Sequence, residues 1–226
     1  MEHAGADRVG PRGVARRRAR APAAAGGGTA AQQGIKLYRL AYYQYESNRP
    51  IPQQLAEFKR QLDELAAFNR ELGITAVYQN HSGTSIFGAP IWDLYTAIKD
   101  IPVSEIGMAL DIGHATVEGG QSWPVQCSLM RPHLRAVYVK DFVWRGRDVQ
   151  WVPLGEGRVD PRYFASLRQS KFTGPISLHI EYLDDKDAQR TEKYLAAFER
   201  DIKLSLIHIS EPTRLRRNSY AVFCLK

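Results

Sequence analysis

The stretch Met108–His114, MALDIGH, joins an apolar run to an aspartate and a histidine. The run predicts a buried strand, and both polar side chains follow where that strand gives way to a glycine-containing turn. Three further segments share this design, each an apolar run ending in metal-binding or proton-handling side chains: AVYQNH at Ala76–His81, AVYVKD at Ala136–Asp141 and ISLHIE at Ile176–Glu181. Polar groups at the carboxyl ends of successive parallel strands converge on one mouth of the sheet. The repetition therefore predicts an enzyme.

Strand and helix patterns alternate between residues 35 and 203. The predicted strands are Ile35–Tyr43, Ile74–Gln79, Ile106–Asp111, Arg135–Phe142 and Gly174–Tyr182. The predicted helices are Pro52–Leu72, Ile91–Lys99, Trp123–Arg131, Pro161–Gln169 and Asp187–Lys203, and a Trp- and Arg-rich excursion at Val143–Leu154 is predicted as a hairpin. Strict alternation of this kind is typical of a parallel α/β sheet with right-handed crossovers.

Spacing and length favour part of a barrel. Gln79, Asp111, Lys140 and Glu181 follow one another at intervals of 32, 29 and 41 residues, the length of a strand-helix unit. A closed eight-stranded barrel needs about 250 residues, whereas residues 35–203 number 169. We therefore predict the α/β class and a partial (β/α)8 TIM barrel. An open doubly wound sheet is the alternative, disfavoured because no glycine-rich phosphate loop follows the first strand.

The net charge of +7 lies at the two ends of the chain. Residues 1–34 carry a net +4 and residues 204–226 a net +3, which leaves residues 35–203 neutral. A neutral core predicts no nucleic-acid partner, and the lack of an apolar run of about 18 residues predicts no membrane partner. The single core cysteine, Cys127, favours a reducing compartment, and we expect a cytoplasmic protein. An organelle-targeting role for the Arg-rich start is the alternative.

Both terminal segments look separate from the fold. Residues 1–34 are rich in Arg, Ala and Gly with few large apolar side chains, so we predict a disordered arm. Residues 204–226 resemble the translation of a sequencing adapter and are predicted to be a foreign tail, in which Cys224 carries no functional weight. The domain itself is predicted to span residues 35–203 of what would then be a gene fragment.

Two pairs of residues could bind a metal ion. Asp111 offers a hard oxygen and His114 an imidazole, a combination that suits Mn²⁺, Mg²⁺, Co²⁺ or Zn²⁺. The alternative is that Asp111 caps the following helix and His114 packs beneath a loop. His179 and Glu181 share one face of a strand, where a buried carboxylate needs a cation, a partner or a proton. The alternative there is a salt bridge from Glu181 to Lys140 or Arg135.

Other polar groups suit a sugar or polyol substrate. Gln79, Asn80 and His81 supply hydrogen-bonding groups at a strand end, or simply close a turn. Lys140, next to Asp141, could hold a phosphate, carboxylate or enediolate oxygen, or form an ion pair across strands. Weaker candidates, each with packing or a surface turn as the alternative, are Glu156 between two glycines and the tryptophans Trp123, Trp144 and Trp151.

Taken together, the motifs YQNH, DIGH, YVKD, PLGEG and HIEY resemble those of the sugar-phosphate isomerase/epimerase family, the xylose isomerase-like TIM barrels. The resemblance covers about residues 35–200 and implies the last five βα units of the barrel. It also implies a divalent metal held by a Glu, an Asp, a His and a Glu from successive strand ends. Asp111 and Glu181 match two of these ligands, whereas Gln79 and Tyr138 stand at the other two positions. An amide and a phenol should weaken metal binding, and Gln79 cannot serve as the second of two opposed bases.

The resulting hypothesis is a metal-dependent isomerase or epimerase that moves a proton next to the carbonyl of a sugar, sugar phosphate or polyol. The expected metal ligands are Asp111, Glu181, His114 and Gln79; the expected catalytic residues are Glu181, His81 and Lys140; and the expected substrate-binding residues are Asn80, His114, Lys140, Glu156 and Trp144. One rival is an endonuclease IV-like metal-dependent hydrolase, disfavoured by the neutral core. The other is a carbohydrate-binding barrel without catalysis, which Gln79 and Tyr138 favour.

Overall fold

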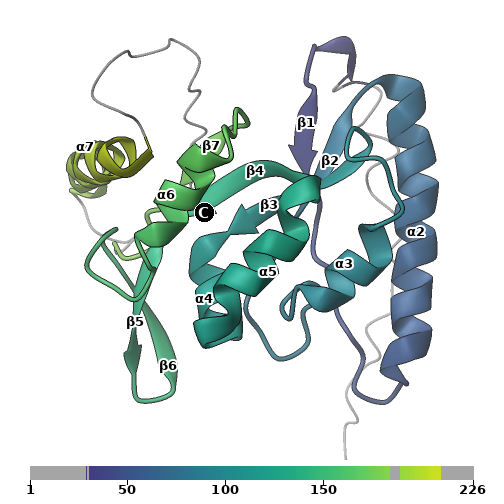
Figure 1. Cartoon of the computed structure of the whole chain (residues 1–226), viewed down its shortest axis with the longest axis horizontal. Helices are drawn as coiled ribbons and strands as arrows, with labels where there is room; N and C mark the ends of the chain where they lie inside the picture. The colour runs from purple at the N-terminus through teal and green to yellow at the C-terminus, as the bar shows by residue number, and fades with distance from the viewer. Residues whose placement is uncertain (1–28, 30, 184–188, 210–226) are drawn as a thin grey trace, which may run out of the picture.

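The computed structural model describes residue 29, residues 31–183 and residues 189–209. Most of the predicted arm and residues 210–226 of the predicted foreign tail lie outside these described residues. Five parallel strands form a curled sheet in the order β1-β2-β3-β4-β7, and a separate two-stranded sheet pairs β5 with β6 (Figure 1). This arrangement confirms the predicted α/β class and the partial barrel.

The elements follow the predicted alternation. The strands are β1 (Leu37–Arg39), β2 (Thr75–Gln79), β3 (Ile106–Asp111), β4 (Leu134–Val139), β5 (Asp141–Arg145), β6 (Asp148–Val152) and β7 (Ile176–Leu178). The helices are α2 (Ile51–Leu72), α3 (Trp92–Ile98), α4 (Ile112–Gly119), α5 (Trp123–Met130), α6 (Arg162–Gln169) and α7 (Arg190–Ile209), with short 3-10 turns η1 (Gly120–Ser122) and η2 (Arg131–His133). No described helix is both long and apolar enough to span a bilayer.

Helix α2 shows how the sequence sets these elements. It begins after Pro50, whose fixed φ suits a helix start, and it ends at Gly73, which adopts the left-handed conformation with φ 62°. Phe58, Leu62 and Leu65 recur at helical spacing and are buried. The apolar face of α2 therefore packs into the hydrophobic core, and its charged face is exposed to solvent.

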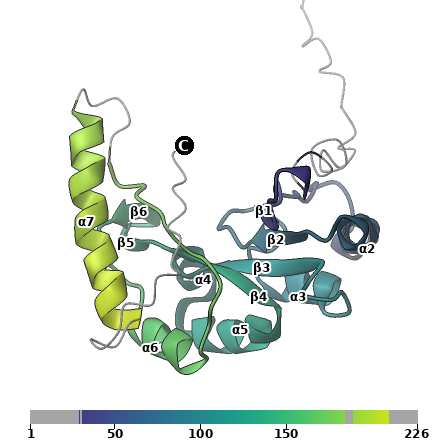
Figure 2. The same cartoon turned by 90° about the horizontal axis from the view of Figure 1, so that it is seen from above.

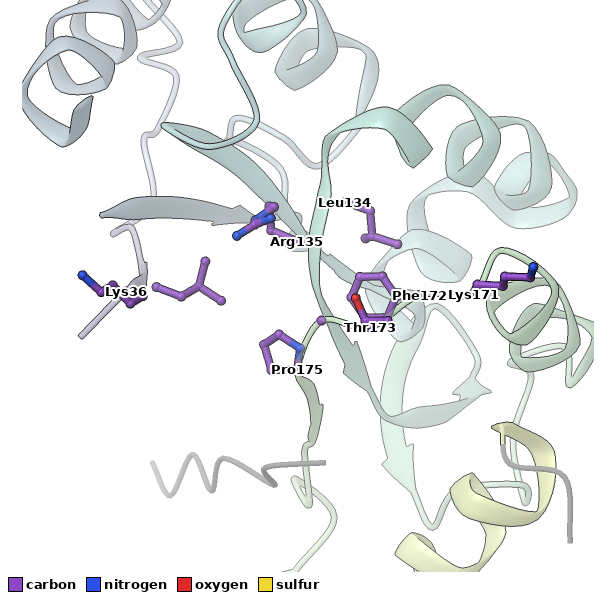
Figure 3. A pocket seen from close by; sticks show the side chains of 9 residues that line it. Lys36, Leu134, Arg135, Lys171, Phe172, Thr173 and Pro175 are labelled. Atoms are coloured by element: carbon purple, nitrogen blue, oxygen red, sulfur yellow. The ribbon is translucent and has the colours of Figure 1, made fainter. Parts of the chain in front are cut away.

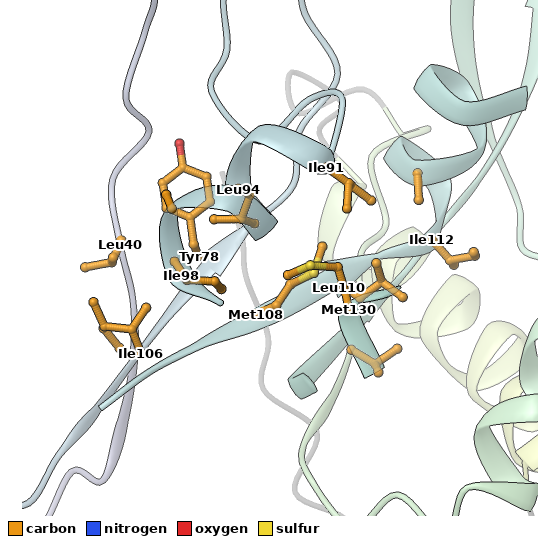
Figure 4. Close-up of a cluster of buried hydrophobic side chains, with 14 of the residues drawn as sticks. Leu40, Tyr78, Ile91, Leu94, Ile98, Ile106, Met108, Leu110, Ile112 and Met130 are labelled. Atoms are coloured by element: carbon orange, nitrogen blue, oxygen red, sulfur yellow. The ribbon is translucent and has the colours of Figure 1, made fainter. Parts of the chain in front are cut away.

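The sheet has two unlike faces. Figure 2 shows α3, α5 and α6 together on one side of the curled sheet. Large side chains fill that side, including Met108 and Leu110 of β3, as Figure 4 shows for this core. The opposite face, here called the inner face, carries a small layer of Val77, Ala109 and Ala136, with partly buried side chains packed against it. Because side chains alternate along a strand, each strand sends every second residue to the inner face.

The first strand is shorter than predicted. Residues 35–43 were expected to form it, but β1 ends at Arg39, and the last ladder bond runs from Leu40 N to Val77 O at 2.9 Å. After that point the chain turns to the loop that follows β2. Tyr43 N donates to Tyr78 Oη at 3.0 Å, and Gln44 makes an antiparallel bridge to Ile86. Aromatic packing on that loop replaces strand pairing.

The fourth predicted strand is divided at Lys140. β4 ends at Val139 and β5 starts at Asp141, whose buried carboxylate accepts hydrogen bonds from the loop at residues 155–159. Those bonds redirect the chain into the β5–β6 hairpin, which confirms the predicted hairpin at Val143–Leu154. The last predicted strand is likewise shorter, with β7 restricted to Ile176–Leu178.

Two helices depart from the prediction. Helix α4 starts directly after β3, where only a turn was expected, because the Asp111 side chain caps it by accepting from His114 N at 3.1 Å. The closing helix was expected at Asp187–Lys203, whereas α7 spans Arg190–Ile209. Its last residues therefore belong to the segment predicted as a foreign tail.

Candidate active site

Four of the predicted site residues lie together at the carboxyl ends of the strands. Gln79 ends β2 and Asp111 ends β3, whereas Lys140 directly follows β4 and Glu181 lies shortly after β7. We call these four residues the strand-end cluster. Side-chain alternation places them on the inner face, which is where the sequence predicted the site.

Lys140 lies at the centre of the strand-end cluster. Its Nζ is 2.9 Å from Glu181 Oε2 and 3.5 Å from Asp111 Oδ2. Both carboxylate oxygens lie close to the same nitrogen, so the distance between them cannot exceed the sum of the two nitrogen–oxygen distances. Asp111 and Glu181 therefore meet as predicted, and the ion pair from Glu181 to Lys140, the alternative reading of that glutamate, is present.

Asp111 is fully buried and well supplied with donors. Gln79 Nε2 donates to its Oδ2 at 2.9 Å, in addition to the helix-capping bond from His114 N. Burial raises the pKa of Asp111, but Lys140, His114 and His179 outweigh burial and hold that pKa below its usual value. Asp111 is thus an ionised carboxylate at neutral pH.

Asn80 holds the backbone of Asp111. Asn80 Nδ2 donates to the Asp111 carbonyl at 2.9 Å, and Asp111 N donates to Asn80 Oδ1 at 2.8 Å. Both polar atoms of this buried amide therefore have backbone partners. Its predicted role in substrate binding stays a prediction.

Gln79 presents its amino group, and not its oxygen, to Asp111. Its Oε1 accepts from Arg39 Nη1 at 3.1 Å and from Tyr42 Oη at 2.8 Å. Burial raises the pKa of Tyr42 to about 12, so its hydroxyl remains a donor at neutral pH. Arg39 and Tyr42 were not predicted as site residues, because nothing in their own segment shows that they face the end of β2.

His114 is a buried, neutral imidazole. Its ring lies 3.8 Å from the ring of His81, centroid to centroid, and its Nδ1 is 2.8 Å from Ser82 Oγ. Burial lowers the pKa of His114 to about 3, although Asp111 opposes the shift. Its Nε2 is buried without a hydrogen-bond partner and lies 3.8 Å from Asp111 Oδ2.

His179 is a second buried imidazole beside the strand-end cluster. Its Nδ1 lies 3.6 Å from Glu181 Oε1, and its ring packs 4.7 Å from the ring of Tyr138. Its Nε2 is also buried without a hydrogen-bond partner. Each of these two buried imidazole nitrogens retains the capacity for one hydrogen bond.

The hairpin contributes Trp151 to the site. The Lys140 ammonium lies 4.1 Å from the centroid of the Trp151 ring, and the His114 ring meets the same indole edge-on at 5.1 Å. Trp144, the predicted contact, is 44% exposed and packs against Phe142. Trp151 reaches Lys140 because it pairs with Phe142 at the base of the hairpin, whereas Trp144 pairs with Val149 nearer the turn.

Asp141 and Glu156 stand apart from the strand-end cluster. Asp141 faces away from Lys140 and accepts from Gly155 N, Gly157 N and Val159 N at 2.9–3.0 Å. Glu156 is exposed and pairs with Arg200 at 3.5 Å. The Gly155–Gly157 loop is thus fixed by Asp141, and substrate binding by Glu156 stays a prediction.

The side chains of this site do not fit a divalent metal. In the described part of the chain, no three His, Cys, Asp or Glu side chains are grouped so that they could hold an ion. Within the strand-end cluster, the Gln79 amino group and the Lys140 ammonium both point at Asp111 Oδ2. Both are donors, whereas a metal ligand must offer a lone pair.

A cavity of about 700 Å³ lies elsewhere, at the amino ends of the strands (Figure 3). It is lined by Lys36, Leu37, Leu134, Arg135 and residues 171–175. None of the predicted site residues is among them, so this cavity is separate from the strand-end cluster.

Comparison with known proteins agrees with this fold. Residues 9–204 match the family described as "Xylose isomerase-like TIM barrel". No curated protein matches the sequence. One similar solved structure is a D-tagatose 3-epimerase-like protein, with a TM-score of 0.57 and 16% identity over 77% of this chain and 66% of that chain. A second is a D-psicose 3-epimerase in the presence of D-fructose, with a TM-score of 0.59 and 15% identity over 83% of this chain and 72% of that chain. A third is the IOLI protein with a zinc atom, with a TM-score of 0.64 and 15% identity over 80% of this chain and 66% of that chain. The chain thus spans about two thirds of their length, and at such identities the likeness shows the fold.

Proposed function

Since this chain belongs to the xylose isomerase-like TIM-barrel family, we propose that it carries the active site of an isomerase or epimerase. The reaction is proton transfer next to the carbonyl of a sugar, sugar phosphate or related polyol. Structural neighbours named as sugar epimerases support this class, one of them solved in the presence of D-fructose. The chain spans about two thirds of the length of such proteins, so we propose the activity from the geometry of its own site.

The observation that carries the proposal is the pairing of Glu181 with a buried ammonium at the mouth of the sheet. The Glu181 side chain is 20% exposed, whereas that of Lys140 is only 2% exposed. A carboxylate that a ligand can reach can act as the general base, and the fixed ammonium beside it can stabilise the oxyanion that forms. The imidazoles of His114 and His179 lie beside this pair, and each keeps one buried nitrogen without a hydrogen-bond partner.

The chemistry follows from these positions. Glu181 removes the proton from the carbon next to the carbonyl, and the electron pair of that C–H bond forms the double bond of an enediolate. The carbonyl oxygen gains the negative charge, which Lys140 stabilises through a charge-assisted hydrogen bond. Return of the proton to the same carbon from the other face gives an epimer, and return to the neighbouring carbon gives an isomer. His81, whose ring packs against that of His114, is the second candidate for proton delivery.

The metal dependence predicted from sequence is not part of this reaction, because the groups facing Asp111 Oδ2 are hydrogen-bond donors. The hydrolase alternative requires several clustered metal ligands. The described residues contain no such group.

Solvent-proton exchange provides the test. The protein is incubated in D₂O with a panel of ketoses and ketose phosphates, and NMR follows deuterium entering the carbon next to the carbonyl. Glu181→Gln should slow exchange by a factor on the order of 10²–10⁴, the usual contribution of a general base. The matched control is Glu64→Gln, an exposed glutamate of α2 that pairs with Arg60. Ligand binding without exchange in the wild type would instead support the carbohydrate-binding alternative.

A further inference from the structure

We propose that the Lys140 ammonium is the resident cation of the strand-end cluster and stands where Asp111 and Glu181 would otherwise hold a divalent metal. The inference deepens the proposed function, on which its catalytic meaning rests. Its test is a binding measurement and does not depend on turnover.

The position of Lys140 is the first support. A metal held by both carboxylates needs metal–oxygen distances of about 2.0–2.6 Å. The space that meets this requirement lies between Asp111 Oδ2 and Glu181 Oε2, and Lys140 Nζ already contacts both oxygens there. The Trp151 ring covers the ammonium at 4.1 Å, where an indole face attracts a cation but offers no ligand atom to a metal.

Charge balance is the second support. Asp111 and Glu181 supply two negative charges, and Lys140 supplies one positive charge between them. A divalent ion added beside Lys140 would reverse the net charge of these three side chains from −1 to +1. Uncompensated charge in such surroundings is strongly unfavourable.

The orientation of Gln79 is the third support. Turning its oxygen toward a metal would require the amide to flip. The flip would break the hydrogen bonds that Gln79 accepts from Arg39 and Tyr42 and the one that it donates to Asp111. The amide is therefore locked with a donor facing the carboxylate.

The backbone leaves room for the lysine. A Cβ at Gly113 would lie 2.9 Å from Lys140 Cγ, 3.1 Å from the Lys140 carbonyl oxygen and 3.3 Å from Asp111 Oδ1. Only a glycine permits the lysine stem to pass so close to α4. The stem is thus packed in place, which keeps the ammonium between the carboxylates.

This arrangement has a consequence for substrate binding. An ammonium has three N–H donors, of which one is donated to Glu181 Oε2 at 2.9 Å, while Asp111 Oδ2 lies 3.5 Å from the same nitrogen. A remaining N–H can bind a substrate oxygen without displacing either carboxylate. Lys140 then supplies a single, directed hydrogen bond in place of the two-oxygen chelation that a metal ion offers.

The test measures uptake of Co²⁺ alone, followed by its visible absorption and by metal analysis after equilibrium dialysis. The wild-type protein should take up no stoichiometric Co²⁺, and its unfolding midpoint should be the same in EDTA and in Co²⁺. Lys140→Met keeps the stem but removes the charge that balances the carboxylates. It should bind Co²⁺ at least tenfold more tightly than the wild type. Lys99→Met, at an exposed lysine beside Asp100, is the matched control and should behave as the wild type does.

Two results would overturn the inference. One is a wild-type protein that binds one equivalent of Co²⁺ and loses it on Asp111→Asn. The other is a Lys140→Met protein that folds yet takes up no more Co²⁺ than the wild type; should that variant not fold, the wild-type result decides alone. If the wild type binds no Co²⁺ and shows no proton exchange with any ketose, the proposed reaction is wrong but this inference stands. If the wild type shows exchange and binds Co²⁺ through Asp111, this inference is wrong but the proposed reaction stands.

Discussion

Replacement of Asp141 tests how strongly one buried carboxylate organises the loop beside the site. Asp141 Oδ1 accepts from Phe142 N and Val159 N, and Oδ2 accepts from Gly155 N and Gly157 N, all at 2.9–3.0 Å. The residue is 1% exposed. Asp141→Ala therefore removes the acceptor of four backbone donors at once.

The expected loss follows from the number of donors. A buried donor left without a partner costs about 1–3 kcal/mol, and some of the four amides will regain water as the loop moves. We expect Asp141→Ala to lower the free energy of unfolding by about 4 kcal/mol or more. Asp141→Asn keeps one oxygen and turns an amino group toward the other pair of amides, so it should cost about half as much.

Urea unfolding followed by tryptophan fluorescence measures these losses, and hydrogen exchange at Gly155, Gly157 and Val159 locates them. Asp148→Ala, at an exposed aspartate of the same hairpin, is the matched control and should change stability by less than about 0.5 kcal/mol. The reasoning would be refuted if both Asp141 variants unfolded within about 1 kcal/mol of the wild type with unchanged loop exchange.

Two further predictions concern the site. The pKa of His114 lies at about 3 because of burial, below its unfolded value, so the stability tied to the neutral ring is present above about pH 6.5 and is lost as the pH falls. Between pH 7.5 and 5.0 the wild type should lose about 2 kcal/mol more than His114→Gln, and equal losses in urea titrations would contradict this. Gly113→Ala should destabilise α4 by about 1–3 kcal/mol through contact with Lys140, and a raised unfolding midpoint would show that helix propensity wins instead.

Sequence periodicity was sufficient to predict the order of the helices and strands and the proximity of residues that are far apart in the chain. Asp111 and Glu181 are far apart in the chain, yet each follows an apolar run, and strand ends of a parallel sheet share one edge. The same argument placed Lys140 beside them. It could not decide between a metal and an ion pair, because both need the same charged residues in the same place.

Details that depend on local competition were beyond the sequence. The β-branched residues and the glycine that follow Asp111 have low helix propensity, so the sequence did not predict that α4 starts there. The Asp111 side chain caps the helix and stabilises this start. Trp151 and Trp144 share one face of the hairpin, and Trp151 is the one beside Lys140 because it pairs with Phe142 at the base, whereas Trp144 pairs with Val149 nearer the turn.

Lys140 and Asp141 are consecutive residues with different roles. Lys140 faces the carboxylates at the strand ends, whereas Asp141 accepts hydrogen bonds from the loop that follows the hairpin. Trp151, which covers the ammonium, therefore belongs to a hairpin that contains neither Asp111 nor Glu181. A hairpin of different sequence could be grafted between residues 142 and 154 to reshape the ligand's surroundings, while the charged centre beneath it kept its make-up.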